Sequence, residues 1–103
     1  MELPSKIRFA DKKLQSAFNS LIGGKNEEVE LYLQLISAFE KIENNAFCGI
    51  QIPKKLIPKE YIRKRKINNL WKLNLPNVWR LLYSIENQEI IVVAIILEWL
   101  PHK

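Results

Sequence analysis

Two cations and an amide are spaced so that they could meet a phosphate group on one face of a β-hairpin. Lys72, Asn74 and Arg80 alternate with aromatic and aliphatic residues on either side of a turn. Alternation with a period of two is typical of strands, whose side chains point to opposite faces. An Arg guanidinium offers a planar fork to phosphate oxygens. A second cation nearby lowers the pKa of a Lys, which leaves more of its amine neutral and able to act as a proton acceptor. This pattern favours phosphate binding with proton transfer beside it.

The length of the turn decides which side chains face each other across the hairpin. A three-residue loop at Leu75–Asn77, with Asn77 at a positive-φ position, pairs Lys72 with Arg80 about 5 Å apart at Cβ. A two-residue loop at Pro76–Asn77 would mix cations with aromatic residues on both faces, so the three-residue loop is the prediction. One face would then carry Trp71, Leu73, Trp79, Leu81, Tyr83 and Ile85, and the other Lys72, Asn74, Arg80, Ser84, Leu70 and Leu82. We expect the aromatic residues to pack in the core, with base stacking as the alternative.

The positive charge of the chain is concentrated in its middle third. The 103 residues carry a net charge of +5, but residues 46–80 hold nine Lys/Arg against Glu60 alone, a net of +8. Clustering of this kind is expected of a surface that binds the phosphates of a nucleic acid, most favourably RNA. The alternative is an ordinary solvated run of charge. The candidate RNA-binding residues are Lys54, Lys55, Lys59, Arg63, Lys64, Arg65, Lys66 and Asn74.

Apolar spacing and capping residues predict a helical hairpin in the first half of the chain. A short strand, Lys6–Phe9, precedes a helix that Asp11 caps and Gly23–Gly24 ends. A second helix, capped by Asn26, runs to Asn44–Asn45.

The second half of the chain predicts an extended crossing followed by a three-stranded meander. Pro53 and Pro58 interrupt the crossing, and Pro58 can start a helical turn that ends at Arg65. The predicted strands are 69–75, 78–85 and 89–99, with residues 86–88 as the second connection. The last strand is apolar on both faces, which is typical of a central strand. The prediction is one α+β domain, 1–103, in which an N-terminal helical hairpin packs on a small antiparallel meander with a short N-terminal strand.

Composition also bears on localisation and on cofactors. The longest apolar run, Ile90–Leu97, is far below the roughly 20 residues that span a bilayer, and the first residues do not form a signal segment. We therefore expect a cytoplasmic protein. Cys48 is the only cysteine, so no internal disulfide can form, and one Cys with one His leaves too few ligands for structural zinc. We expect Cys48 to be buried and inert, and we expect no metal or other cofactor.

The segment from Leu70 to Tyr83, LWKLNLPNVWRLLY, resembles the central hairpin of the RelE/ParE superfamily of toxin–antitoxin toxins. The similarity extends to the order of elements and covers most of the chain, and the aromatic-Arg-Leu-x-Tyr core is its most specific part. It implies a RelE-like fold and a toxin of a type II toxin–antitoxin system. RelE-type members cleave mRNA on the ribosome without a metal, whereas ParE-type members inhibit DNA gyrase. Both are held inactive by an antitoxin.

The resemblance also implies roles for three residues. Arg80 matches the Arg that contacts the scissile phosphate, and Lys72 matches the first of two lysines on the preceding strand. His102 lies where some relatives place a catalytic histidine, although a terminal His without function is the alternative. In the implied reaction the 2′-hydroxyl attacks its own 3′ phosphate and leaves a 2′,3′-cyclic phosphate. Lys72 would assist proton removal or stabilise charge, and Arg80 would hold the pentacoordinate phosphate.

The sequence departs from the family pattern at two positions. Asn74 stands in place of the second lysine and cannot accept a proton as an amine would, and the expected C-terminal tyrosine would lie just beyond Lys103. The alternative is therefore a ParE-like gyrase inhibitor or a catalytically inactive relative that acts by protein binding. In either case the expected partner is an acidic, amphipathic antitoxin that forms a heteromeric complex. It would neutralise residues 46–80, cover exposed apolar positions around Leu70 and Leu82, and compete with RNA.

Overall fold

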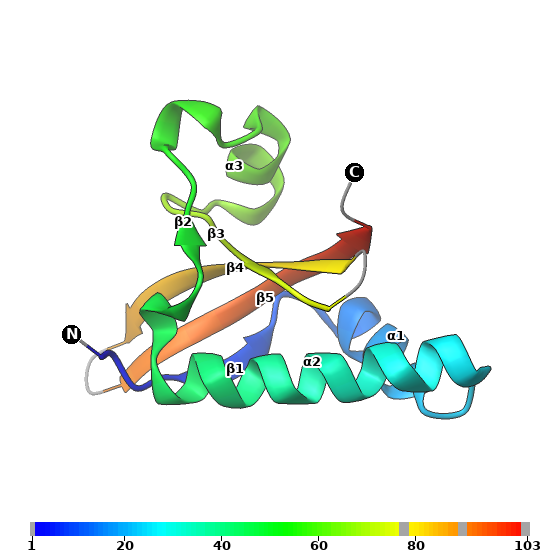
Figure 1. Cartoon of the computed structure of the whole chain (residues 1–103). Helices are drawn as coiled ribbons and strands as arrows, with labels where there is room; N and C mark the ends of the chain where they lie inside the picture. Colours follow the sequence, from blue (N-terminus) through cyan, green and yellow to red (C-terminus); the bar gives the residue numbers. More distant parts are fainter. Residues whose placement is uncertain (1, 77–78, 89–90, 102–103) are drawn as a thin grey trace.

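Five strands form one mixed sheet in the order β1–β5–β4–β3–β2. The computed structural model describes residues 2–76, 79–88 and 91–101. The strands are β1 (Lys6–Phe9), β2 (Ile50–Gln51), β3 (Trp71–Asn74), β4 (Trp79–Gln88) and β5 (Ile91–Pro101). β1 runs parallel to β5, and all other neighbours are antiparallel. β5 lies between β1 and β4, which confirms the central position predicted from its apolar faces (Figure 1).

Two helices cover one face of this sheet, which we call the helix face (Figure 1). α1 (Lys12–Leu21) begins after Asp11, whose Oδ1 accepts a hydrogen bond of 2.7 Å from the N–H of Leu14, so the predicted cap is confirmed. α2 (Asn26–Asn44) begins one residue earlier than predicted, because Lys25 is its cap residue and Asn26 is already helical. Of the helices in the described part of the chain, none is long and apolar enough to cross a membrane.

The main hydrophobic core lies between the helix face and the two helices. Its centre is aromatic: the ring of Phe18 lies 4.8 Å from that of Tyr32, 5.3 Å from that of Phe39 and 5.4 Å from that of Phe9. The sheet residues in or against this core include Trp71, Leu73, Trp79, Leu81, Tyr83 and Ile85. The predicted apolar face of the hairpin is therefore confirmed.

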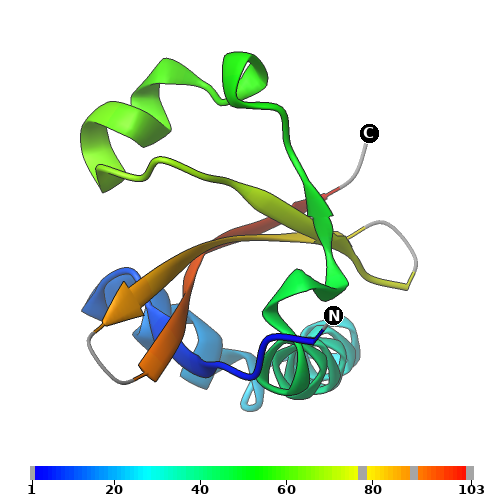
Figure 2. The same cartoon turned by 90° about the vertical axis from the view of Figure 1, so that its left-hand side faces the viewer.

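The opposite face of the sheet, which we call the α3 face, is covered by the chain between β2 and β3 (Figures 1 and 2). This segment forms the 3₁₀ turn η2 (Lys54–Leu56) and the helix α3 (Lys59–Arg65), which follows Pro58 as predicted. A second, smaller core fills the space beneath it, made of Ile57, Ile67, Leu70, Leu82, Ile95 and Leu97. Leu70 is 1% exposed and Leu82 is 6% exposed. The expectation that a partner covers them is wrong, because the protein's own chain does so.

The meander strands differ from their predicted bounds at the second connection. Residues 86–88 were expected to form a loop, but they continue β4, and Gln88 lies opposite Ile91 of β5. The pairing with β5 extends the strand through polar residues that local composition assigns to a turn. A register shift between Leu82 and Tyr83 marks a β-bulge in the same pair of strands. The α+β class, with a helical hairpin packed on a meander and a short N-terminal strand, is confirmed.

Candidate nucleic-acid interface

The turn of the β3–β4 hairpin lies one residue further along the chain than predicted. The N–H of Leu75 donates to the carbonyl oxygen of Trp79 at 2.9 Å, so Leu75 still pairs with β4 and the loop begins at Pro76. Pro76 thereby takes the first loop position, which its fixed φ favours, instead of the second. The predicted backbone conformation of Asn77 lies outside the described residues.

This displacement changes the partners of the cations but not their face. Lys72 lies opposite Leu82, and Arg80 lies opposite Asn74, so the predicted direct pair of Lys72 with Arg80 is wrong. Moving the loop by one residue changes the partner of each β3 residue by two positions on β4. A shift of two positions leaves every side chain on its predicted face. Lys72 and Arg80 are diagonal neighbours on the two paired strands, and the Cα atoms of such neighbours lie roughly 7–8 Å apart. Their long side chains can therefore approach one phosphate from two sides with less mutual repulsion than side-by-side cations would have.

The three candidate site residues in the described part of the hairpin all remain accessible to solvent. Lys72 and Arg80 are half-buried, and Asn74 is exposed. Arg80 lies between Asn74 on β3 and Leu100 on β5, so its neighbours across the sheet are one amide and one aliphatic side chain. Aliphatic neighbours restrict the stem of a long cationic side chain while its charged end reaches solvent.

Buried contacts beneath Lys72 hold its strand in place. The hydroxyl of Tyr83, which is fully buried, donates to the carbonyl oxygen of Ala46 at 2.7 Å and accepts from the N–H of Gly49 at 3.1 Å. Burial raises the pKa of Tyr83, so this hydroxyl stays protonated. A Cβ on Gly49 would lie 2.5 Å from the carbonyl oxygen of Lys72, so only glycine lets the chain pass this close to β3.

The turn that contains these contacts is η1 (Ala46–Cys48). Phe47 stacks on Trp71 with ring centroids 5.4 Å apart, and Trp71 in turn stacks on Tyr83 at 6.3 Å. Cys48 is half-buried instead of fully buried as expected, and burial raises the pKa of its thiol. A raised pKa keeps the thiol protonated and unreactive.

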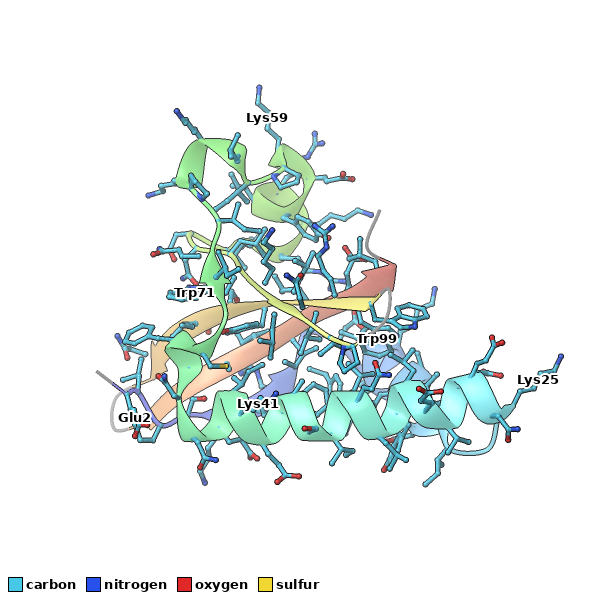
Figure 3. The ribbon with its side chains drawn as sticks, in the orientation of Figure 1. Glu2, Lys25, Lys41, Lys59, Trp71 and Trp99 are labelled. Carbon is cyan, nitrogen blue, oxygen red and sulfur yellow. The ribbon has the colours of Figure 1, made fainter. Side chains whose placement is uncertain are left out.

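The seven other predicted RNA-binding residues form a layer above the α3 face, which we call the basic layer. It consists of Lys54 and Lys55 on η2, Lys59, Arg63, Lys64 and Arg65 on α3, and Lys66 at the end of α3. All are exposed except Arg65, and the side chain of Lys59 extends away from the sheet (Figure 3). Figure 2 shows η2 and α3 on one side of the sheet. Lys72 lies opposite Leu82 of the second core, and Arg80 is two residues from Leu82 on the same strand, so both cations are on this side too.

Arg65 differs from the rest of the basic layer because it is already paired. Its Nη1 donates to Oδ2 of Asp11 at 2.8 Å, and this bond holds the pKa of Asp11 below its ordinary value. The pair ties the end of α3 to the beginning of α1. Arg65 therefore has a structural contact of its own and offers less charge to a ligand than its neighbours.

Glu98 is a candidate residue that sequence reasoning missed. It lies opposite Leu82, so Lys72, Leu82 and Glu98 form one row across the α3 face. Glu98 borders a cavity of about 340 Å³ beneath α3, together with Glu60, Tyr61, Lys64, Arg65 and Leu97. Burial raises its pKa, and the negative charge of Glu60 raises it further. The sequence feature that could have identified Glu98 is that it is a lone carboxylate in an otherwise apolar strand.

His102, the third predicted catalytic residue, lies outside the described residues. Within the described part of the chain, no group of three His, Cys, Asp or Glu residues is arranged to hold a metal ion.

Comparison with family models, curated proteins and solved structures finds no match for this chain.

Proposed function

We propose that this protein is a RelE-like toxin of a type II toxin–antitoxin system, which cleaves mRNA on the ribosome. The observation that carries the proposal is the diagonal pair of Lys72 and Arg80, on the sheet face that lies beneath the basic layer. The sequence of the β3–β4 hairpin and the order of the elements, which resemble those of the family, support it.

In the proposed reaction, the 2′-hydroxyl of an mRNA nucleotide attacks the adjacent 3′ phosphate. The bond from phosphorus to the 5′-oxygen breaks, and the products are a 2′,3′-cyclic phosphate and a 5′-hydroxyl. Arg80 holds two non-bridging oxygens as negative charge grows on them, and Lys72 stabilises the same charge or takes the proton of the attacking hydroxyl. Asn74, opposite Arg80, can donate a hydrogen bond to the phosphate. His102 would return a proton to the leaving oxygen.

In the proposed reaction, the protein supplies the charged groups that contact the mRNA, and the ribosome supplies the positioning of the mRNA. The exposed lysines and arginines of the basic layer contact phosphates and carry no sequence information. The ribosome fixes the mRNA in one geometry, and such positioning can lower the barrier by several kcal/mol, on the order of 7–11 in well-oriented systems.

Expression of an Arg80→Ala variant tests the proposed site. The parent chain should arrest translation and leave mRNA cut within codons, and Arg80→Ala should lose both effects. Lys12→Ala is the matched control, because it removes one exposed cation of α1, outside the basic layer, and leaves the sheet unchanged. Arrest and cleavage by Arg80→Ala at the level of the parent would show that Arg80 is not the phosphate ligand.

The neighbourhood of Arg80 also favours a second candidate, a relative that inhibits gyrase or acts by protein binding without cleavage. Asn74 is the direct partner of Arg80, and its amide cannot take up a proton as a lysine amine would. This candidate predicts no cleavage of ribosome-bound mRNA and inhibition of gyrase supercoiling by the parent chain. Measuring both activities on one preparation separates the two, and mRNA cleavage without gyrase inhibition rules the second out.

The proposed partner is an acidic, amphipathic antitoxin that binds the basic layer. Since Leu70 and Leu82 are buried, its apolar side chains would instead contact Leu56, which is 63% exposed, and Ile62, which is 45% exposed. Both lie among the cations of η2 and α3. A segment that pairs carboxylates with these cations would compete with RNA, and added salt would slow its association more than it speeds its dissociation. Simultaneous binding of antitoxin and RNA, with no loss of RNA affinity, would contradict a shared surface.

A further inference from the structure

A polar cavity of about 430 Å³ lies on the α3 face at the end of the sheet away from Arg80. One wall is the chain from Lys66 to Asn69, and the other is the part of β4 from Ser84 to Asn87. Ser84 and Arg80 are separated by four residues of the same strand, about 13 Å at the usual rise of a strand. The cavity is therefore distinct from the Lys72–Arg80 pair but lies on the same face.

Ser84 is the unusual residue of this cavity. It is 1% exposed, and its Oγ has no hydrogen-bond partner among the described residues. A buried hydroxyl without a partner costs about 1–3 kcal/mol, and such groups in folded proteins usually have a reason connected with a ligand or a bound water. The hydroxyl can both donate and accept one hydrogen bond.

The other wall holds an amide in a fixed orientation. The side chain of Asn69 clamps the backbone of Ile85, accepting from its N–H at 2.8 Å and donating to its carbonyl oxygen at 2.9 Å. The same Asn69 amide donates to Oδ1 of Asn68 at 2.8 Å. With its oxygen occupied, Asn68 has its NH₂ group left to offer as a donor. Lys66 adds a third donor, and its left-handed backbone, with φ of 55°, turns the chain from α3 into this wall.

We infer that this cavity is a nucleobase subsite, which takes one unpaired base of the RNA bound by the neighbouring cations. This inference rests on RNA being the ligand of the proposed function, and it adds a base preference that a phosphate-binding surface lacks. Unpaired bases are the usual targets of sequence-specific RNA recognition, because they can enter pockets and form hydrogen bonds along their edges. The volume lies within the usual range for small-molecule sites, about 300–1,000 Å³.

The donors of the cavity define which base it prefers. Glu86 also lines the cavity, and its carboxylate faces the guanidinium of Arg8 at 3.8 Å. The Asn68 NH₂, the Lys66 ammonium and the Ser84 hydroxyl can each donate, so a base edge with carbonyl oxygens fits better than one with amino groups. Uracil presents two carbonyl oxygens and no amino group, whereas guanine and cytosine each carry one carbonyl oxygen and one amino group, and adenine carries an amino group alone. Lys64 and Arg65 border a smaller cavity of about 160 Å³ that shares Ile67 and Glu86 with this one, so cations are at hand for the adjoining phosphate. The subsite should therefore prefer uracil.

The test is the binding of short 2′-O-methyl oligouridylate, oligocytidylate and oligoadenylate of equal length, which cannot be cleaved because the 2′-oxygen is blocked. The parent chain should bind the uridine oligomer about 3- to 10-fold more tightly than the others, the effect of one net hydrogen bond. Asn68→Ala and Ser84→Ala should each reduce that preference toward onefold while leaving binding to oligoadenylate unchanged. Asn19→Ala, which removes an exposed amide from α1, is the matched control and should keep the preference.

The outcomes separate the subsite from the proposed function. Equal binding of the three oligomers, or a preference that survives Asn68→Ala, overturns the subsite while leaving ribosome-dependent cleavage to its own assay. A uracil preference that Asn68→Ala abolishes, in a protein that cleaves no mRNA, supports the subsite and overturns the nuclease. Failure to bind any oligomer overturns the subsite whatever the cleavage assay shows.

Discussion

Replacing Tyr83 with Phe removes a single hydroxyl that joins β4 to Ala46 of η1 and to Gly49. That hydroxyl donates to the carbonyl oxygen of Ala46 and accepts from the N–H of Gly49, and the residue is fully buried. Tyr83→Phe leaves both backbone groups without a partner in a place that solvent reaches poorly. Each such group costs about 1–3 kcal/mol, so we expect the free energy of unfolding to fall by roughly 2–4 kcal/mol after the gain from no longer burying the hydroxyl.

A loss of this size is easily measured. Small domains are stable by about 5–15 kcal/mol, so Tyr83→Phe should remove a large share of the total and lower the Tm by roughly 10–25 °C. Urea unfolding followed by circular dichroism gives the free energy directly, provided that the slope with urea is unchanged. Tyr32→Phe is the control, because Tyr32 is half-buried with its ring stacked on Phe18, and it should cost about 0.5 kcal/mol or less. A loss below about 1 kcal/mol for Tyr83→Phe would refute the view that this hydroxyl holds η1 against the sheet.

Two further substitutions test the surroundings of the site. Gly49→Ala places a Cβ 2.5 Å from the carbonyl oxygen of Lys72 and should destabilise the fold by about 1–3 kcal/mol in urea unfolding. Gly23→Ala is the control and should not destabilise the fold, because the nearest atom to its added Cβ lies at 3.9 Å. Equal effects of the two substitutions would contradict the close approach of Gly49 to β3. Burial and Glu60 raise the pKa of Glu98 in the folded state, so stability falls as pH rises through and above 4.5. Glu98→Gln should therefore raise the Tm at pH 7 but leave it unchanged below about pH 4. An equal change in Tm at the two pH values would contradict a raised pKa of Glu98.

The faces of the hairpin could be predicted from the sequence, but the pairing of its cations could not. The alternation of Trp71, Leu73, Trp79 and Leu81 survives any register shift of two residues, and the observed shift is two. The partner of Arg80 depends on where the loop begins, and the backbone preference of Pro76 decides that point. Sequence patterns therefore identify which residues share a surface more securely than which two of them touch.

The second layer of the fold shows a different limit of sequence reasoning. Leu70 and Leu82 are apolar residues on a face that also carries cations, and nothing local indicates what covers them. The chain folds back over them through Ile57 and Ile67, forming a second core that a proline-interrupted segment did not predict. The cavity beside Ser84 and the raised pKa of Glu98 arise from the same fold-back. Both depend on contacts between residues far apart in the sequence.

We propose that Lys72 and Arg80 cleave mRNA on the ribosome, and a reconstituted cleavage assay tests this proposal. Purified protein is added to programmed ribosomes, and primer extension maps the new 5′ ends of the mRNA. We expect cuts within the codon in the decoding site, a 2′,3′-cyclic phosphate on the upstream fragment, and loss of cutting by about 10²-fold or more in Arg80→Ala but not in Lys12→Ala. Ribosome-bound mRNA that stays intact with the parent protein, or is cut equally by Arg80→Ala, would contradict it.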